Sequence, residues 1–103
     1  MNTYRLKILM PEKKLYDGEI ISATVPGAGG LLTILAGHEA MVALLGQGTL
    51  IIRTAEKTLK GETGPGLLEV SRNEAVIMIR SFIWVHENGE KSETLQNTNQ
   101  MLP

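Results

Sequence analysis

The chain has 103 residues, close to the commonest size of a single domain, and 43% of them are hydrophobic while 20% are charged. This balance excludes an intrinsically disordered chain. Ten basic and eleven acidic residues are interspersed and give a net charge of −1, so the sequence lacks the basic character of a nucleic-acid-binding or anionic-membrane-binding protein.

The sequence contains no cysteine, which excludes disulfides, thiolate nucleophiles and cysteine-based zinc sites. Its apolar runs fall well short of the roughly 18–20 residues that a transmembrane helix needs. The first fourteen residues do not match a secretory signal peptide. We therefore expect no direct insertion into a membrane.

The first half of the chain predicts three strands. Residues 4–10 alternate, with Tyr4, Leu6, Ile8 and Met10 on one face of the expected strand, and Pro11 ends this pattern. The following segments are expected to be a second strand over residues 15–25, containing the turn-prone pair Asp17-Gly18 and ending at Pro26-Gly27, and a third strand over residues 31–35.

The second half predicts further short strands separated by glycine, proline or polar turns. They are expected over residues 41–45, 49–54, 58–61, 67–71, 75–79 and 82–85, with 49–54 and 58–61 forming a hairpin. Short strands at this spacing without a long helical pattern are typical of an all-β sandwich or barrel.

Two of these segments, residues 75–79 and 82–85, are apolar on both faces of the expected strand. Such strands are commonly central strands covered on both sides by their own chain. Alternatively, a partner protein covers an outward face that carries Val76, Met78, Ile83 or Val85.

The final residues are rich in Asn, Gln, Glu, Lys and Thr and supply little apolar surface for a core. We therefore expect a β-domain over residues 1–86 and a polar, partly disordered tail over residues 87–103.

The sequence V-P-G-A-G-G-L-L-T-I-L-A-G-H, residues 25–38, contains three glycines within four positions. A phosphate-binding loop directs backbone N–H groups at an anion, usually at a helix N-terminus and with a lysine nearby. Here an apolar run follows the glycines, without a lysine or a helical pattern. A tight turn that requires a positive φ is the favoured interpretation, and no cofactor is expected.

His38 and His86 are the two histidines of the chain. His38 precedes Glu39, but neighbouring strand residues point to opposite faces, which disfavours an acid–base pair. A metal site would need a carboxylate from a distant segment. We expect His38 to hydrogen-bond within a loop, with no catalytic residue and no metal.

Four blocks in order resemble the N-terminal domain of epsilon subunits of F-type rotary ATP synthases. They are P-E-K-K-L-Y-D-G-E-I (11–20), V-P-G-A-G-G-L-L-T-I-L-A-G-H (25–38), G-Q-G-T-L-I-I-R (46–53) and G-P-G-L-L-E-V-S-R-N-E-A-V-I-M (64–78). The resemblance covers residues 6–81. It implies a flattened sandwich of two five-stranded sheets.

The same resemblance implies a non-catalytic rotor subunit that binds the gamma subunit, sits on the ring of c subunits and couples rotation to ion transport. It would be a peripheral member of a hetero-oligomer at the cytoplasmic face of the membrane. The loop implied to face the c ring consists of Pro26, Gly27, Ala28, Gly29, Gly30, Leu31, Leu32 and Thr33. The residues implied to contact gamma are Met10, His38, Met41, Val42 and Ala43.

The chain departs from this family at the loop that faces the c ring. The family usually carries acidic residues there, whereas this sequence has Gly29, Leu31 and Thr33. An apolar contact is therefore expected in place of ion pairs. Residues 86–103 also lack the length and the alanine-rich pattern of the family's C-terminal helical hairpin, so we expect neither a helical brake nor a nucleotide site.

A different class of protein remains as the alternative: a stand-alone β-sandwich that binds a small ligand or peptide. It predicts a concave pocket with convergent polar groups. An enzyme has the least support, because the sequence contains no recognisable set of nucleophile, base and orienting residue.

Overall fold

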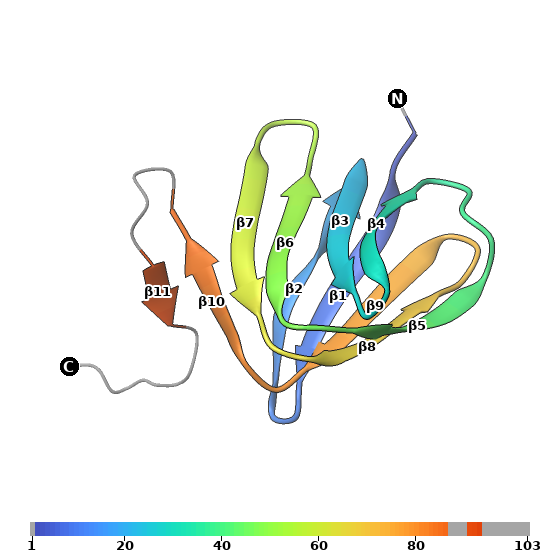
Figure 1. Ribbon diagram of the computed structural model, residues 1–103. Coiled ribbons are helices and arrows are strands. Elements are labelled where there is room, and N and C mark those ends of the chain that lie inside the picture. The colour runs from blue at the N-terminus through green and yellow to red at the C-terminus, as the bar shows by residue number, and fades with distance from the viewer. Residues whose placement is uncertain (1, 87–90, 94–103) are drawn as a thin grey trace.

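The computed structural model describes residues 2–86 with their side chains and the backbone of residues 91–93. This part of the chain is all-β and contains eleven strands and no helix (Figure 1). The strands are β1 (Tyr4–Met10), β2 (Lys13–Ile20), β3 (Ser22–Gly27), β4 (Gly30–Leu35), β5 (Met41–Leu45), β6 (Gly48–Arg53), β7 (Thr58–Thr63), β8 (Gly66–Val70), β9 (Glu74–Ile79), β10 (Phe82–Val85) and β11 (Lys91–Glu93).

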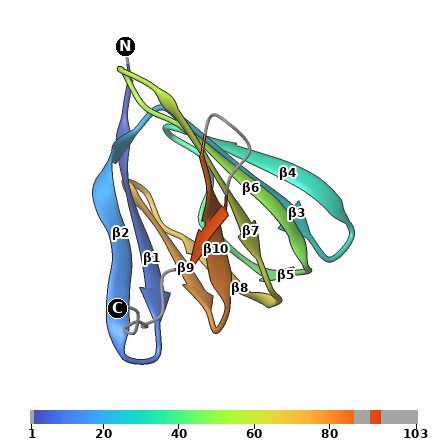
Figure 2. The ribbon, with the colours of Figure 1, turned by 90° about the vertical axis from the view of Figure 1, so that its left-hand side faces the viewer.

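The strands form two halves that face each other across the core. One half contains β4, β3, β6, β7, β10 and β11, and the other contains β5, β8, β9, β1 and β2. A single pair, Gly27 with Leu45, joins β3 to β5 and makes the two halves one hydrogen-bonded sheet. Figure 2 shows β1 and β2 on one side of the molecule and β3, β4 and β6 on the other. The predicted all-β sandwich is confirmed, with its two layers continuous at this pair.

The core is formed by the inward-facing members of alternating strands. In β9, and in β1 from Tyr4 to Ile8, every second residue is buried, which is the pattern of a sheet with one face on the core. The largest fully buried side chains are Leu6, Ile8, Ile20, Val25, Ile34, Leu50, Ile52, Leu68 and Ile77. Since these residues come from both halves, burial of their apolar surface holds the two layers together.

The strand prediction for residues 15–25 is wrong in one respect. Two strands occupy this region, β2 and β3, with a bend at Ile21 between them, and β2 passes through the pair Asp17-Gly18 without a turn. Gly18 pairs with Leu6, and Asp17 pairs with Lys7 on β1. The long-range ladder to β1 therefore overrides the local turn preference of Asp-Gly.

Of the predicted tail, the structure describes residues 91–93, which pair as β11 with β10. The remaining tail residues and the expectation of disorder lie outside the described part of the chain.

Candidate partner-binding surfaces

The glycine-rich segment forms the tip of the β3–β4 hairpin. Gly27 and Gly30 form the last pair of the ladder, and Ala28 and Gly29 are the exposed turn residues between them. Gly30 has φ +133°, where an L side chain is strained, and a Cβ on Gly27 would lie 2.7 Å from the carbonyl oxygen of Gly30. The predicted tight turn with a positive φ is confirmed. The segment leads into a strand, so it lacks the helix N-terminus of a phosphate-binding loop.

The residues predicted to face the c ring divide into exposed and buried positions. Pro26 is buried and packs closely against Gly48, where an added Cβ would lie 2.8 Å from Cβ of Pro26. Pro26 therefore offers no surface to a partner. Leu32 is half-buried and packs against the core. Leu31, by contrast, is 77% exposed. The accessible edge of the hairpin is therefore its tip together with the outward-facing side chains of β4.

The hairpin is tied to the rest of the fold by the first strand. The Tyr4 hydroxyl donates a hydrogen bond of 2.6 Å to the backbone carbonyl of Ile34 on β4. Tyr4 is buried, and burial raises its pKa from 10.0 to about 12. This contact positions β4 against the opposite half of the molecule.

Strand β5 also exposes large apolar side chains. Val42 is 64% exposed and Leu44 is 67% exposed, because they lie on the outward face of the strand. Met41 and Ala43, which were predicted to contact gamma, alternate with them and pack against the core. Of the three predicted contacts on this strand, only Val42 presents its side chain freely to a partner.

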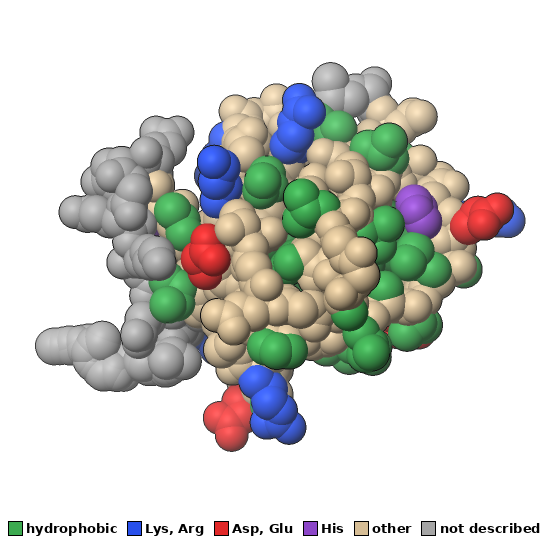
Figure 3. Space-filling model, in the orientation of Figure 1, with side chains coloured by type: hydrophobic (Ala, Val, Ile, Leu, Met, Phe, Trp, Pro, Cys, Tyr) green, Lys and Arg blue, Asp and Glu red, His purple; other side chains and the backbone are tan. Residues whose placement is uncertain are grey.

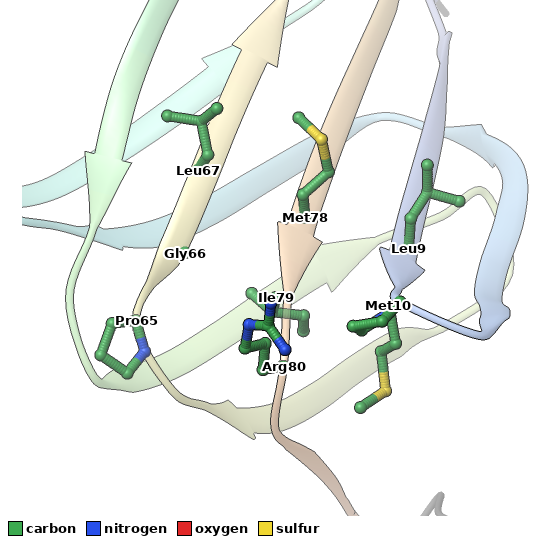
Figure 4. A pocket seen from close by; sticks show the side chains of 9 residues that line it. Leu9, Met10, Pro65, Gly66, Leu67, Met78, Ile79 and Arg80 are labelled. Atoms are coloured by element: carbon green, nitrogen blue, oxygen red, sulfur yellow. The ribbon is translucent and has the colours of Figure 1, made fainter.

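An apolar row continues from β5 across three further strands. Leu44 pairs with Leu67 on β8, Leu67 with Met78 on β9, and Met78 with Leu9 on β1. All four side chains lie on the outward face, since each has a buried neighbour along its strand. These buried neighbours are Leu45, Leu68, Ile77 and Ile8. Figure 4 shows Leu67, Met78 and Leu9 side by side on adjacent strands. We call this set, Leu44, Leu67, Met78 and Leu9, the apolar row.

A shallow cavity of about 330 Å³ lies beside the apolar row. Its lining is formed by Leu9, Met10, Pro11, Pro65, Gly66, Leu67, Met78, Ile79 and Arg80. Arg80 is the one polar side chain among them, so the cavity lacks the convergent polar groups that orient a small ligand. Met10, a predicted gamma contact, lines this cavity next to the row (Figure 4).

Apolar side chains also gather over β4, β5 and β8 in the space-filling view (Figure 3).

The sequence left two alternatives for the outward side chains of residues 75–79 and 82–85. Each of them is half-buried, namely Val76, Met78, Ile83 and Val85. Met78 belongs to the apolar row, and Val76 lies on the same outward face, paired with Glu69 and Lys7. The chain itself therefore covers these residues only in part.

His38 lies in the loop between β4 and β5. Its Nδ1 is 2.9 Å from the carbonyl oxygen of Glu39, and its backbone N–H donates to the carbonyl of Leu35. The predicted hydrogen bond within a loop is confirmed. In the described residues no group of three or more His, Asp or Glu side chains is arranged to hold a metal ion.

On the half formed by β5, β8, β9, β1 and β2, the outward face carries charged side chains beyond the apolar row. Asp17 accepts hydrogen bonds from Nε of Arg5 at 2.7 Å and from Nζ of Lys14 at 2.8 Å, and Lys7 pairs with Glu74 at 2.9 Å. The hydrogen bond from Arg5, followed by that from Lys14, holds the pKa of the Asp17 carboxyl well below its usual range. The face thus combines an apolar region with a charged border, as protein interfaces do.

The sequence prediction did not include Leu9, Leu44 or Leu67. Strict alternation along residues 41–45 would have separated Val42 and Leu44 from Met41, Ala43 and Leu45. The continuity of Leu44 with Leu67 and Leu9 depends on the strand order, which sequence alternation does not reveal.

The described residues form a β-sandwich with a glycine-tipped hairpin and a partly exposed apolar outer face, which are features of a protein-binding module. Residues 3–85 match the family described as ATP synthase, Delta/Epsilon chain, beta-sandwich domain, and the chain belongs to this family.

Relatives of known sequence carry the name ATP synthase epsilon chain. That of Leptospira borgpetersenii is 41% identical over 73 residues, covering 71% of this chain and 58% of the relative. That of Protochlamydia amoebophila is 38% identical over 86 residues, covering 82% and 58%. That of Sulfurimonas denitrificans is 27% identical over 93 residues, covering 89% and 72%. The chain thus spans about three fifths of the length of the first two relatives.

Solved structures share the fold. A chain of the Euglena gracilis mitochondrial ATP synthase, in a structure of OSCP, F1 and c-ring, aligns with a TM-score of 0.77 and 19% identity, over 82% of this chain and 55% of that one. A chain of the Tetrahymena thermophila mitochondrial ATP synthase central stalk and c-ring aligns with a TM-score of 0.67 and 16% identity, over 96% of this chain and 76% of that one.

Within the described residues, no helix has both the length and the hydropathy required to span a bilayer.

Proposed function

We propose that this chain is the β-sandwich part of an ATP synthase epsilon subunit and acts as a non-catalytic component of the central stalk. The observation that carries the proposal is the apolar row on the outer face of a fold that belongs to the epsilon family, in which Leu44 is 67% exposed and the other three side chains are half-buried. Apolar surface that the chain itself covers only in part, and that continues across four strands, is typical of a protein interface.

The proposed partner of the apolar row is the gamma subunit. The row ends near Met10 at one side and includes Leu44 beside Val42 at the other, so two residues implied to contact gamma border it. Its charged border at Lys7, Glu74 and Asp17 supplies a polar rim. Met41 and Ala43 support this surface from the core side, and His38 shapes the loop that leads into β5.

The proposed contact with the c ring is the β3–β4 hairpin, through Ala28, Gly29, Gly30, Leu31 and Thr33. These residues are exposed, while Pro26, Gly27 and Leu32 hold the hairpin in place. Because the hairpin bears no charged side chain between residues 25 and 35, its contact would be apolar. In this assembly the subunit would transmit gamma rotation to the c ring during ATP synthesis and ion transport, from the cytoplasmic face of the membrane.

Gel filtration of the chain with its cognate gamma subunit tests the proposal. We expect co-elution of the unmodified chain and at least a tenfold weaker complex for Leu44→Asp, since a charge would be desolvated within the apolar row. Lys60→Asp, an exposed residue of β7 on the opposite half, is the matched control and should bind normally. Failure of the folded, unmodified chain to bind a folded gamma subunit would refute the proposal.

A further inference from the structure

Strands β2 and β4 each have one hydrogen-bonded neighbour within the described part of the chain, as does the short strand β11 at the other end of the strand order. β2 pairs with β1, and β4 pairs with β3. The two edges differ in chemistry: β2 carries two lysines, an aspartate and a glutamate, whereas β4, with the sequence GLLTIL, has no charge and no proline. Charges and prolines are the common means by which proteins prevent edge strands from pairing with other chains. Strand β4 lacks this protection.

The free edge of β4 is formed by alternate residues. Pro26 has no N–H, so its pair with Leu31 is a non-hydrogen-bonded pair of the antiparallel ladder. The N–H and C=O groups of Leu31, Thr33 and Leu35 therefore point away from β3. The carbonyl of Leu35 accepts from His38 N, which leaves the N–H of Leu35 and both groups of Leu31 and Thr33 for another strand.

The sequence of this edge is nearly symmetric about Thr33. Reading outward from Thr33, the chain has Leu32 and Ile34, then Leu31 and Leu35. Leu31 is 77% exposed and Leu35 is 56% exposed, and both lie on the outward face of β4. In an antiparallel pairing of two such strands centred on Thr33, each Leu31 would lie opposite the Leu35 of the other strand.

We propose that β4 pairs antiparallel with β4 of a second copy of this chain, on a two-fold axis at Thr33. The pairing would form two hydrogen bonds between the Thr33 residues and two from the N–H of Leu35 to the carbonyl of Leu31. It would also bury the four outward leucines as two cross-strand pairs. A two-fold axis produces such an interface from one self-complementary patch, which is why a second copy fits this edge.

The dimer would be reversible, because one strand edge buries less area than the roughly 1,200–2,000 Å² of stable interfaces. Leu31 and Thr33 also belong to the surface proposed for the c ring, so self-pairing would exclude that contact. This last consequence rests on the proposed function, whereas the dimer itself does not.

Sedimentation of the purified chain over a concentration series tests the dimer. We expect the mass to rise toward that of two chains, and the double variant Leu31→Lys with Leu35→Lys to remain monomeric. The double variant Leu31→Glu with Leu35→Glu should also remain monomeric alone, but a mixture of the two should form a heterodimer. Val42→Lys with Leu44→Lys is the matched control on β5 and should dimerise like the unmodified chain.

Disulfide trapping locates the axis, and the sequence contains no cysteine that would compete with an introduced one. Paired Cα atoms lie about 5.5 Å apart in a hydrogen-bonded antiparallel pair, within the range of a disulfide. Thr33→Cys should therefore form a covalent dimer under mild oxidation. Thr24→Cys is the control, since Thr24 contacts Thr33 through its hydroxyl at 2.9 Å but lies one strand further from the axis. A chain that stays monomeric, or equal cross-linking by both variants, would overturn the proposal and leave the edge to a strand of another protein.

Discussion

Tyr4 and Ile34 join the two halves of the molecule through a buried hydrogen bond, in which the Tyr4 hydroxyl donates to the Ile34 carbonyl at 2.6 Å. The residues are thirty positions apart in sequence, on β1 and β4. The bond holds the hairpin strand that carries the proposed partner surfaces against the strand that begins the opposite layer.

Removal of this hydroxyl should lower stability and change its dependence on alkaline pH. Tyr4→Phe is expected to lower the free energy of unfolding near pH 7 by about 1 kcal/mol, the usual net value of a buried hydrogen bond. Because folding raises the pKa of Tyr4 to about 12, its contribution is complete below the ordinary value of 10.0 and is lost as pH rises through the folded value.

Urea unfolding of both proteins from pH 8 to pH 12 measures this effect. The unmodified chain should lose more stability than Tyr4→Phe over this interval, so that the two curves converge. Parallel curves would show that Tyr4 does not titrate as its burial requires.

Asp17 in the charged border is expected to stabilise the fold from neutral pH into the acidic range. Asp17→Asn should be destabilising at neutral pH, because Asp17 accepts hydrogen bonds from Arg5 and Lys14. Folding lowers the pKa of this carboxyl, so its contribution is present above the ordinary value of 3.8 and disappears as pH falls through the lower folded value. Chemical unfolding at several pH values should show the two proteins converging only in strong acid.

High salt should also reduce the effect of Asp17→Asn, since these groups are near the surface. Glu12→Gln, an exposed carboxylate in the turn between β1 and β2, is the control and should change stability little. An equal effect of the two substitutions would contradict a specific role for Asp17.

Gly61 on β7 should be intolerant of a side chain for reasons of space. A Cβ at this position would lie 2.0 Å from Cζ of Phe82, whose ring is buried and packs edge-on against Trp84 at 4.8 Å between centroids. Gly61→Ala is therefore expected to displace the ring and to cost about 1–3 kcal/mol. Thermal unfolding followed by the fluorescence of Trp84, the single tryptophan, provides the measurement.

Gly29→Ala is the matched comparison, because a Cβ there meets nothing within 4 Å. It should leave the melting temperature nearly unchanged. A loss of stability at Gly29 as large as that at Gly61 would contradict the assignment of Gly29 to an open turn.

Substitution on the hairpin should separate folding from assembly. Leu31→Asp should change the free energy of unfolding by less than about 0.5 kcal/mol, since Leu31 is exposed. On the proposed function it should nevertheless weaken association with the c ring while gamma binding is retained. Denaturation of the purified variant and reconstitution with gamma and c ring measure the two effects.

Ile34→Ala provides the contrast on the same strand, because Ile34 is buried in the core. It should cost about 2–5 kcal/mol of stability. If Leu31→Asp unfolded the domain as Ile34→Ala does, Leu31 would be a core residue and the hairpin assignment would be wrong.

The amino-acid sequence by itself determined most of the local structure. Alternation identified β1, glycine and proline marked the tip of the β3–β4 hairpin, and glycine, proline or polar turns separated the strands from residue 48 to residue 85. These features are local, since a strand's two faces and a turn's φ requirement depend on neighbouring residues. The ordered blocks also identified the family, which the match over residues 3–85 confirms.

Only the tertiary structure decided which residues share a surface. Leu9, Leu44, Leu67 and Met78 are far apart in the sequence and meet because β5, β8, β9 and β1 are neighbours in the sheet. The same long-range pairing carried β2 through the turn-prone pair Asp17-Gly18. Strand order depends on burial summed over the whole core, so no local pattern reveals which outward side chains form a continuous interface.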